Sequence, residues 1–176
     1  MEHISNLLPE LHKQEGKLKM QQETCQKDLV IRKNIEKILG CFPTAKDMIV
    51  GMSHAVMEKK YRHIRTPQAA YETNYITLSE MKGLYSPESP VMLIETWIMQ
   101  LSLFLDLPIS KDQIKELAWL IYDDNHYLNI AEMTLVFTRI KKGHYGQFFG
   151  RIDPVEIQRW FREYRSERGI YISKLP

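Results

Sequence analysis

The sequence predicts an all-α fold, a globular helical bundle of about seven helices that begins with a long N-terminal amphipathic helix. Apolar residues recur every three or four positions along most of the chain, and no segment alternates apolar and polar residues with a period of two. Residues typical of helix starts and helix ends separate the apolar stretches. With 176 residues and a hydrophobic content of 44%, the chain can bury a core of ordinary size.

Residues 4–40 carry a thin apolar stripe with the approximate 4,3 spacing of a coiled coil. This spacing predicts one long helix, or two helices broken near Gly16. Such a narrow stripe suits a partner helix, and it equally suits packing along the helix's own domain. The chain is therefore divided into an N-terminal arm, residues 1–42, and a helical core domain, residues 43–176, with a basic C-terminal end. The candidate partner-binding residues on the stripe are Leu8, Leu11, Leu18 and Leu29.

Three helices are expected in the middle of the chain, each with a serine or threonine at its start. The first starts at Thr44, where Asp47 resembles a capping partner, and the second starts at Thr66, just before a proline. The third starts at Ser89, again before a proline, and contains the most apolar run, residues 91–107. That run is too short and too often interrupted by polar residues to cross a membrane, so we expect a core helix that other helices cover on most sides.

Three more helices are expected in the C-terminal part. Ser110 with Gln113 forms a capping box for one helix, and Asn129 can cap the next. Asp153, followed by a proline, reads as the start of a helix that continues to about Arg168.

A glycine-rich stretch at residues 139–154 separates the last two of these helices. Gly143, Gly146 and Gly150 punctuate a run that holds three aromatic residues and has cations on both sides. A glycine can take the positive φ that ends a helix, and it lets the backbone approach another group closely. Two interpretations remain open: a tight interhelical loop whose aromatic rings fill the core, or a contact surface for nucleic acid or a protein partner.

Positive charge is concentrated locally. Residues 139–168 contain eight Lys/Arg and four Asp/Glu, a net charge of +4, whereas the whole chain carries only +2, so the rest sums to −2. A second basic cluster surrounds Tyr61. Such clusters can bind phosphates, and nearby aromatic rings can stack on unpaired bases, although an ordinary solvated surface has the same composition. The candidate nucleic-acid-binding residues are Lys141, Lys142, Tyr145, Phe148, Arg151, Arg162 and Arg165, with Lys59, Lys60, Arg62 and Arg65 in the second cluster.

Several chemistries lack a matching pattern. The phosphate-binding loop GxxxxGK[ST] does not occur. Cys25 and Cys41 have no neighbouring Cys or His at ligand spacing, which argues against a zinc site and a disulfide framework and favours a reduced, cytoplasmic setting. Asp123 and His126 form only a weak ligand pair. We therefore expect a protein that is not an enzyme and has no catalytic residues, cofactor or metal.

Residues 132–168 resemble small helical proteins of phages and mobile elements of Bacteroides-type bacteria. The shared pattern is R-x-K-x-G-x-Y-G-x-F-Y-G followed by an Asp-capped helix that ends near an arginine, and Phe149 here replaces the last tyrosine of the pattern. The resemblance covers about the last 50 residues. It implies, by loose association, a replication-accessory or helicase-loader role.

Two functions follow as hypotheses. The first is a non-enzymatic accessory protein of a phage or mobile element that binds DNA, preferably single-stranded, and a replication protein. The alternative is a protein-interaction module that inhibits or redirects a host protein and binds no nucleic acid. Association of identical chains through the N-terminal helix is compatible with either, and no membrane partner is expected.

Overall fold

The computed structural model describes residue 29 and residues 32–175. Their regular structure is helical, apart from one isolated antiparallel bridge between Thr77 and Asn129. The all-α fold class is therefore confirmed. Most of the predicted N-terminal helix lies outside the described residues, and with it lie three candidate partner-binding residues, Leu8, Leu11 and Leu18.

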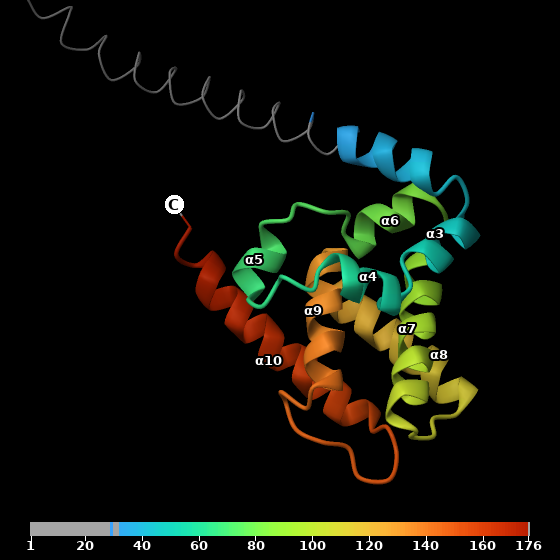
Figure 1. The fold of residues 1–176 in the computed structure, drawn as a ribbon, viewed down its shortest axis with the longest axis vertical. Helices are drawn as coiled ribbons and strands as arrows, with labels where there is room; N and C mark the ends of the chain where they lie inside the picture. The colour runs from blue at the N-terminus through green and yellow to red at the C-terminus, as the bar shows by residue number, and fades with distance from the viewer. Residues whose placement is uncertain (1–28, 30–31, 176) are drawn as a thin grey trace, which may run out of the picture.

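The described residues contain more helices than the seven or so that we predicted (Figure 1). A helical segment occupies residues 32–41. The helices that follow are α3 (Ala45–Gly51), α4 (His54–Lys60), α5 (Pro67–Tyr71), α6 (Leu78–Leu84), α7 (Ser89–Leu105), α8 (Lys111–Asn125), α9 (Ile130–Lys141) and α10 (Pro154–Ile172). The predicted count was too low because the helix predicted from Thr44 is divided into α3 and α4, and the helix predicted from Thr66 is divided into α5 and α6.

The first division separates α3 from α4 at Met52 and Ser53. Side chains of α7 satisfy the backbone groups that this break exposes. Trp97 donates its indole N–H to the carbonyl of Met52 at 2.9 Å, and Gln100 accepts from the backbone N–H of His54 at 2.9 Å. These partners are more than 40 residues away in sequence, so local spacing gave no sign of the break.

The second division separates α5 from α6. Asn74 lies between them with a φ of 46°, which an α-helix cannot contain. Thr77 then starts α6 with a capping box closed by Glu80. The segment is fixed from the far side of the chain, because Leu78 donates its N–H to Leu128 and Ile130 donates its N–H to Ile76.

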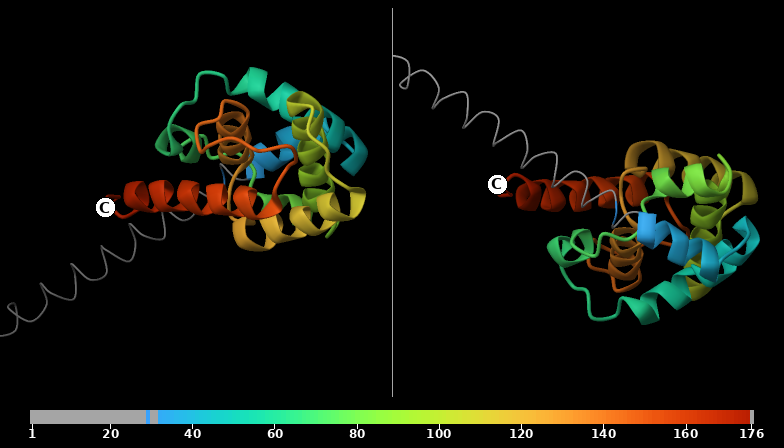
Figure 2. Two further views of the ribbon diagram at one scale, coloured as in Figure 1. Left: turned by 90° about the horizontal axis from the view of Figure 1, so that it is seen from below. Right: turned by 90° about the horizontal axis from the view of Figure 1, so that it is seen from above.

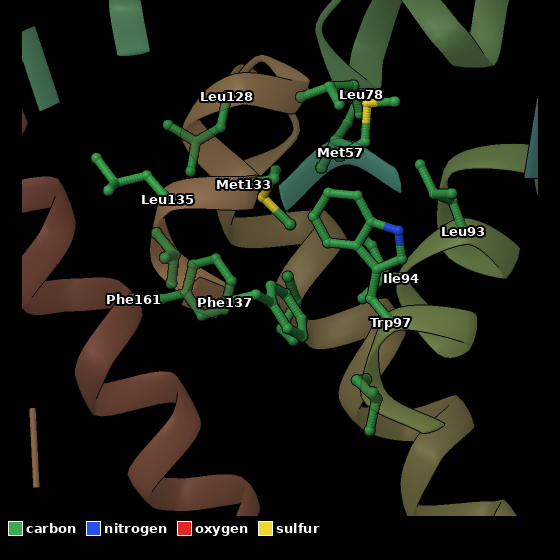
Figure 3. Close-up of a cluster of buried hydrophobic side chains, with 14 of the residues drawn as sticks. Met57, Leu78, Leu93, Ile94, Trp97, Leu128, Met133, Leu135, Phe137 and Phe161 are labelled. Atoms are coloured by element: carbon green, nitrogen blue, oxygen red, sulfur yellow. The ribbon is translucent and has the colours of Figure 1, made fainter. Parts of the chain in front are cut away.

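The core forms around α9, which packs against α4, α5, α7 and α10. Trp97, Phe137 and Phe161 meet edge to face at its centre (Figure 3), with ring centroids 5.3 and 6.1 Å apart along the series. α10 runs along one side of the body, and its C-terminal end projects beyond the other helices (Figure 2).

α9, rather than α7, is the more enclosed helix. All of its residues except Thr138, Arg139 and Lys141 are buried. α7 buries one side against its neighbours but exposes Met92, Met99 and Leu103 on the other. The apolar run in α7 therefore overstated how far other helices cover it.

The segment at residues 32–41 joins the same core. Ile38 is buried, and the side chain of Asn34 donates to the carbonyl of Asn74 at 3.1 Å. The hydroxyl of Tyr85 donates to the carbonyl of Phe42 at 2.7 Å. The boundary that we placed after residue 42 thus assigns to the arm a segment that packs on the core domain.

Among the described helices, none combines the length and apolar character that a membrane crossing requires.

Candidate nucleic-acid interface

The glycine-aromatic loop, residues 143–152, joins α9 to α10 and is the orange segment beyond the end of α9 in Figure 1. Gly143, Gly146 and Gly150 have φ values of 67°, 131° and 76°. All three glycines thus adopt the positive φ that a glycine can take at the end of a helix. Ile152 closes the loop, because it is buried and its N–H donates to the carbonyl of Pro108.

Two of the three aromatic rings in the loop face the protein. Tyr145 is only 9% exposed, and its ring lies 6.2 Å from that of Trp160 at an interplanar angle of 20°. Its hydroxyl accepts a hydrogen bond from Arg139 at 3.2 Å, and burial raises its pKa. Phe148 is half-buried, with its ring 4.7 Å from Trp160. The Tyr145 ring is part of the core, as the first of the two interpretations of this stretch expects, so Tyr145 is a poor candidate for stacking on a base.

The third ring, Phe149, is 91% exposed. We did not include it among the candidate residues. No local sequence signal could have found it, because the outward direction of Phe149 follows from the anchoring of Phe148 on Trp160 of α10. Arg151, two residues further on, is also exposed.

Several predicted cations already have partners within the protein. Lys141 forms an ion pair with Glu58 at 2.6 Å. Arg165 donates to the backbone carbonyl of Asp124 at 2.9 Å and lies 3.4 Å from its carboxylate. Lys60 lies 4.0 Å from the ring centroid of Tyr75. A phosphate would have to compete with these contacts, so Lys141, Arg165 and Lys60 are poor first choices for binding one.

Three other predicted cations converge. Arg62 and Arg65, which follow α4, line a hollow of about 150 Å³ together with Lys142 at the end of α9. All three are exposed, and none forms an ion pair with another described residue. The fold thus brings one residue of the C-terminal cluster beside two residues of the second cluster. We call this hollow the cationic cleft.

Glu58 is the acidic residue in the lining of the cationic cleft. Burial alone would raise the pKa of its carboxyl, but the hydrogen bond from Lys141 and the neighbouring positive charges lower it below its usual value. Behind it lies the buried ring of His54, whose pKa burial and the charge of Lys141 lower to about 4. Glu58 is therefore already paired with Lys141 and also feels the charge of Lys142, and the cleft lining keeps more cations than acids.

Two further hollows flank the glycine-aromatic loop. The inner hollow, of about 360 Å³, lies between Leu105, Leu107 and the loop, and Lys142 lines both it and the cationic cleft. The outer hollow, of about 640 Å³, contains Phe149 and Arg151. The two loop hollows share Gly146, Gln147 and Phe148 in their linings. Through these shared residues the three hollows follow one another across the surface.

The remaining predicted residues, Lys59 and Arg162, are exposed but line none of these hollows. The one candidate partner-binding residue that the structure describes, Leu29, is 53% exposed.

Comparison with known proteins gives one family match. The model of a family of unknown function, DUF6633, matches residues 106–173. The matched region contains α8, α9, the glycine-aromatic loop and α10, and therefore Lys142 and Phe149, but it excludes Arg62 and Arg65. No curated protein and no solved structure matches the chain.

Proposed function

We propose that this chain is a non-enzymatic accessory protein of a phage or mobile element that binds single-stranded DNA and a replication protein. The observation that carries the DNA-binding part is the convergence of Arg62, Arg65 and Lys142 on one hollow. These side chains come from segments about 80 residues apart in sequence, and the acid beside them is already paired.

The physical basis of this proposal is electrostatic. Like charges that converge on one hollow repel one another, and an anion placed between them relieves that repulsion. A nucleic-acid phosphate supplies such an anion and releases its condensed counterions when Lys or Arg neutralises it. Arginine also binds a phosphate through two parallel hydrogen bonds, a geometry that suits Arg62 and Arg65.

The test is a salt titration of a fluorescently labelled oligothymidylate, followed by anisotropy. The slope of log affinity against log salt should be near −0.7 for each phosphate contacted on a single strand. The variant R62Q/R65Q/K142Q should bind more weakly and should lose roughly two to three contacts' worth of slope. Its matched control is K82Q/K111Q/K115Q, which removes the same charge from exposed lysines that line none of the three hollows.

Two outcomes would contradict the proposal. Equal weakening in both triple variants would mean that overall charge, and not the cationic cleft, attracts the DNA. Failure of the unmodified protein to bind single- or double-stranded oligonucleotides below about 100 μM near physiological salt would remove the DNA-binding function, because that is weaker than ordinary non-specific affinity.

The replication-protein partner and the mobile-element origin rest on the resemblance of residues 132–168 to phage proteins. Affinity capture with the full chain, followed by mass spectrometry, tests them. Capture of a replicative helicase or primase would support this part of the proposal, and capture of host proteins without a replication role would favour the alternative function.

That alternative is a protein-interaction module without nucleic-acid binding. The observation that favours it is the exposure of Leu29, which is the one candidate residue of the N-terminal apolar stripe that the structure describes. Substitution of Leu11, Leu18 and Leu29 by Lys would place charges on the seam and should abolish association with a partner or a second copy, while the helical signal of the core remains. Sedimentation velocity and circular dichroism measure the two effects. Global unfolding of this variant would show that the seam belongs to the core.

A further inference from the structure

The side chain of Phe149 differs from the other rings of the glycine-aromatic loop. Tyr145 and Phe148 pack on Trp160, whereas Phe149 is 91% exposed and contributes almost nothing to the core. Large apolar rings that stay in water are unfavourable unless another molecule covers them, and both faces of an aromatic ring can stack on a planar group.

The backbone on both sides of the ring is held in place. Phe148 on one side is anchored on Trp160, and the buried Ile152 fixes the loop three residues beyond the ring. Gly150 has a φ of 76°, and a Cβ added there would meet no other atom within 4 Å, so its conformation and not a lack of space requires glycine. Because its neighbours are fixed, the backbone at Phe149 loses little further freedom when a ligand covers the ring.

The inner hollow has the composition of a base-binding site. Leu105, Leu107 and Ile140 provide apolar walls, and the amide of Gln147 can both donate to and accept from the edge of a base. Lys142 stands where the inner hollow meets the cationic cleft, so a phosphate bound in the cleft can continue into a nucleotide whose base enters the hollow.

The charged residues that line the outer hollow sum to zero, with Arg151 and Arg159 against Asp153 and Glu156. Asp153 accepts a hydrogen bond from the N–H of Val155, and Glu156 is paired with Arg159, which also contacts Glu163 at 3.2 Å. Arg151 is exposed and forms no ion pair with the other described residues. One exposed cation, Lys142, thus lines the inner hollow, and another, Arg151, lines the outer hollow together with the exposed ring of Phe149.

We propose that the glycine-aromatic loop binds unpaired bases, with one base stacked on Phe149 and the phosphates on either side held by Lys142 and Arg151. The site therefore accepts a single strand and not a duplex, whose bases are already stacked and paired. This inference rests on the proposed function and assigns the strand preference to the loop. Continuity with the cationic cleft favours a nucleic acid over a protein as the molecule that covers the ring.

The test uses the full chain, F149A and F149W, a labelled oligothymidylate, and an oligonucleotide of the same length in which every base is replaced by an abasic site. F149A should weaken binding of the normal oligonucleotide by about 5- to 150-fold, the range expected for the loss of one stacked base. F149W should bind at least as tightly as the unmodified chain. The abasic oligonucleotide should bind weakly, and its affinity should be the same for the unmodified chain and for F149A.

Three controls separate stacking from other causes. F149A should keep the salt slope and the melting temperature of the unmodified chain, because the ring carries no charge and lies outside the core. L103A removes a similarly exposed side chain, 81% exposed on α7, and should leave DNA binding unchanged. Affinity for a blunt duplex should be the same in F149A and the unmodified chain.

The outcomes distinguish this inference from the proposed function. If F149A binds oligothymidylate as the unmodified chain does while R62Q/R65Q/K142Q does not, the base-binding role is overturned and the cationic cleft stands. If F149A weakens binding and the triple variant behaves as its control, the cleft assignment and the phosphate contact of Lys142 fail, and the stacking of a base on Phe149 stands. If no oligonucleotide binds the unmodified chain, both fall, and a protein is the molecule that covers Phe149.

Discussion

The charged residues at the two ends of α9 are in opposite situations, buried and paired at one end and exposed and unpaired among the described residues at the other. At its N-terminal end, Glu132 is only 1% exposed and accepts hydrogen bonds from the Arg168 guanidinium at 2.6 Å and the Tyr164 hydroxyl at 3.3 Å. Its other oxygen accepts from the backbone N–H of Asn129. At the C-terminal end, Lys142 stands beside Arg62 with no described acid paired to either.

This difference shows that the role of a cation depends on its partner and its burial and cannot be read from charge counts. Residues 139–168 have a net charge of +4, yet most of their cations already form ion pairs within the described chain. These paired cations are Arg139, Lys141, Arg159, Arg165 and Arg168. Except for Arg159, whose partners lie on its own helix α10, the paired cations join two helices, and the cations that remain can bind an anion.

The largest expected effect tests the N-terminal end of α9. Substitution of Arg168 by Met leaves the buried carboxylate of Glu132 without its cation and should lower the free energy of unfolding by about 3 kcal/mol or more. Urea denaturation measures the loss. The double variant E132Q/R168M should recover part of it, because a neutral amide leaves no unpaired charge and can still close the capping box. If R168M leaves the free energy of unfolding unchanged, the pair of Glu132 and Arg168 does not stabilise the fold, and the two ends of α9 do not differ in this respect.

The next effect depends on pH and concerns His54, which is buried on α4. Burial and Lys141 lower the pKa of His54 from 6.5 to about 4, so the folded chain holds a neutral ring that the unfolded chain protonates first. Stability should therefore fall as pH decreases from about 6.5 to 4, by about 2 to 3 kcal/mol at most from this group. Below the usual pKa of its carboxyl, loss of the charge on Glu58 acts in the same direction.

Urea denaturation at several pH values measures this dependence. The variant H54Q cannot titrate, so its stability should vary much less over the same interval. An identical pH dependence in H54Q and the unmodified chain would show that other groups cause it.

A smaller effect tests the loop backbone. Gly143 and Gly146 have positive φ, which a β-branched residue avoids, so G143V and G146V should each destabilise the fold by more than about 1 kcal/mol. The matched control is G169A in α10, where an added Cβ meets nothing and helix propensity favours alanine by about 0.5–1 kcal/mol. In thermal melts, G143V and G146V should have lower melting temperatures than the unmodified chain, and G169A should not. Unchanged melting of both valine variants would contradict the loop geometry.

The smallest effect is expected at the C-terminal end of α9. R62Q and K142Q remove exposed cations that have no described ion-pair partner, so each should change the free energy of unfolding by less than about 0.5 kcal/mol. Chemical denaturation is again the measurement. A clear loss in either variant would place these cations among the residues that hold the fold, as Arg168 does.

Local chemistry made much of the fold predictable. The capping boxes at Thr44, Ser110 and Asn129 and the proline-led starts at Thr66 and Asp153 lie where the sequence indicates, because each depends on residues within one helical turn. The start of α6 also has a local signal, the capping box of Thr77 and Glu80, that the prediction overlooked, whereas the break after α3 was missed because distant partners hold it.

The candidate site was harder to predict for the same reason. The pair Lys141–Glu58 joins residues 83 positions apart, and no spacing rule indicated that it would withdraw Lys141 from the exposed cations. The inward direction of Tyr145 and the outward direction of Phe149 depend on Trp160, which lies on the next helix. Composition located the loop, but only tertiary packing decided which of its side chains face solvent.

The position of Trp160 gives the molecule a spectroscopic probe. Its indole ring lies directly beneath Phe148 and Tyr145, is itself buried, and finds no acceptor for its N–H among the described residues. Its emission should therefore be blue-shifted and sensitive to any shift of the loop. Trp119 is the exposed indole of the three tryptophans and can be replaced by Phe, so that the remaining fluorescence reports on the core at Trp97 and on the loop at Trp160 without an attached dye.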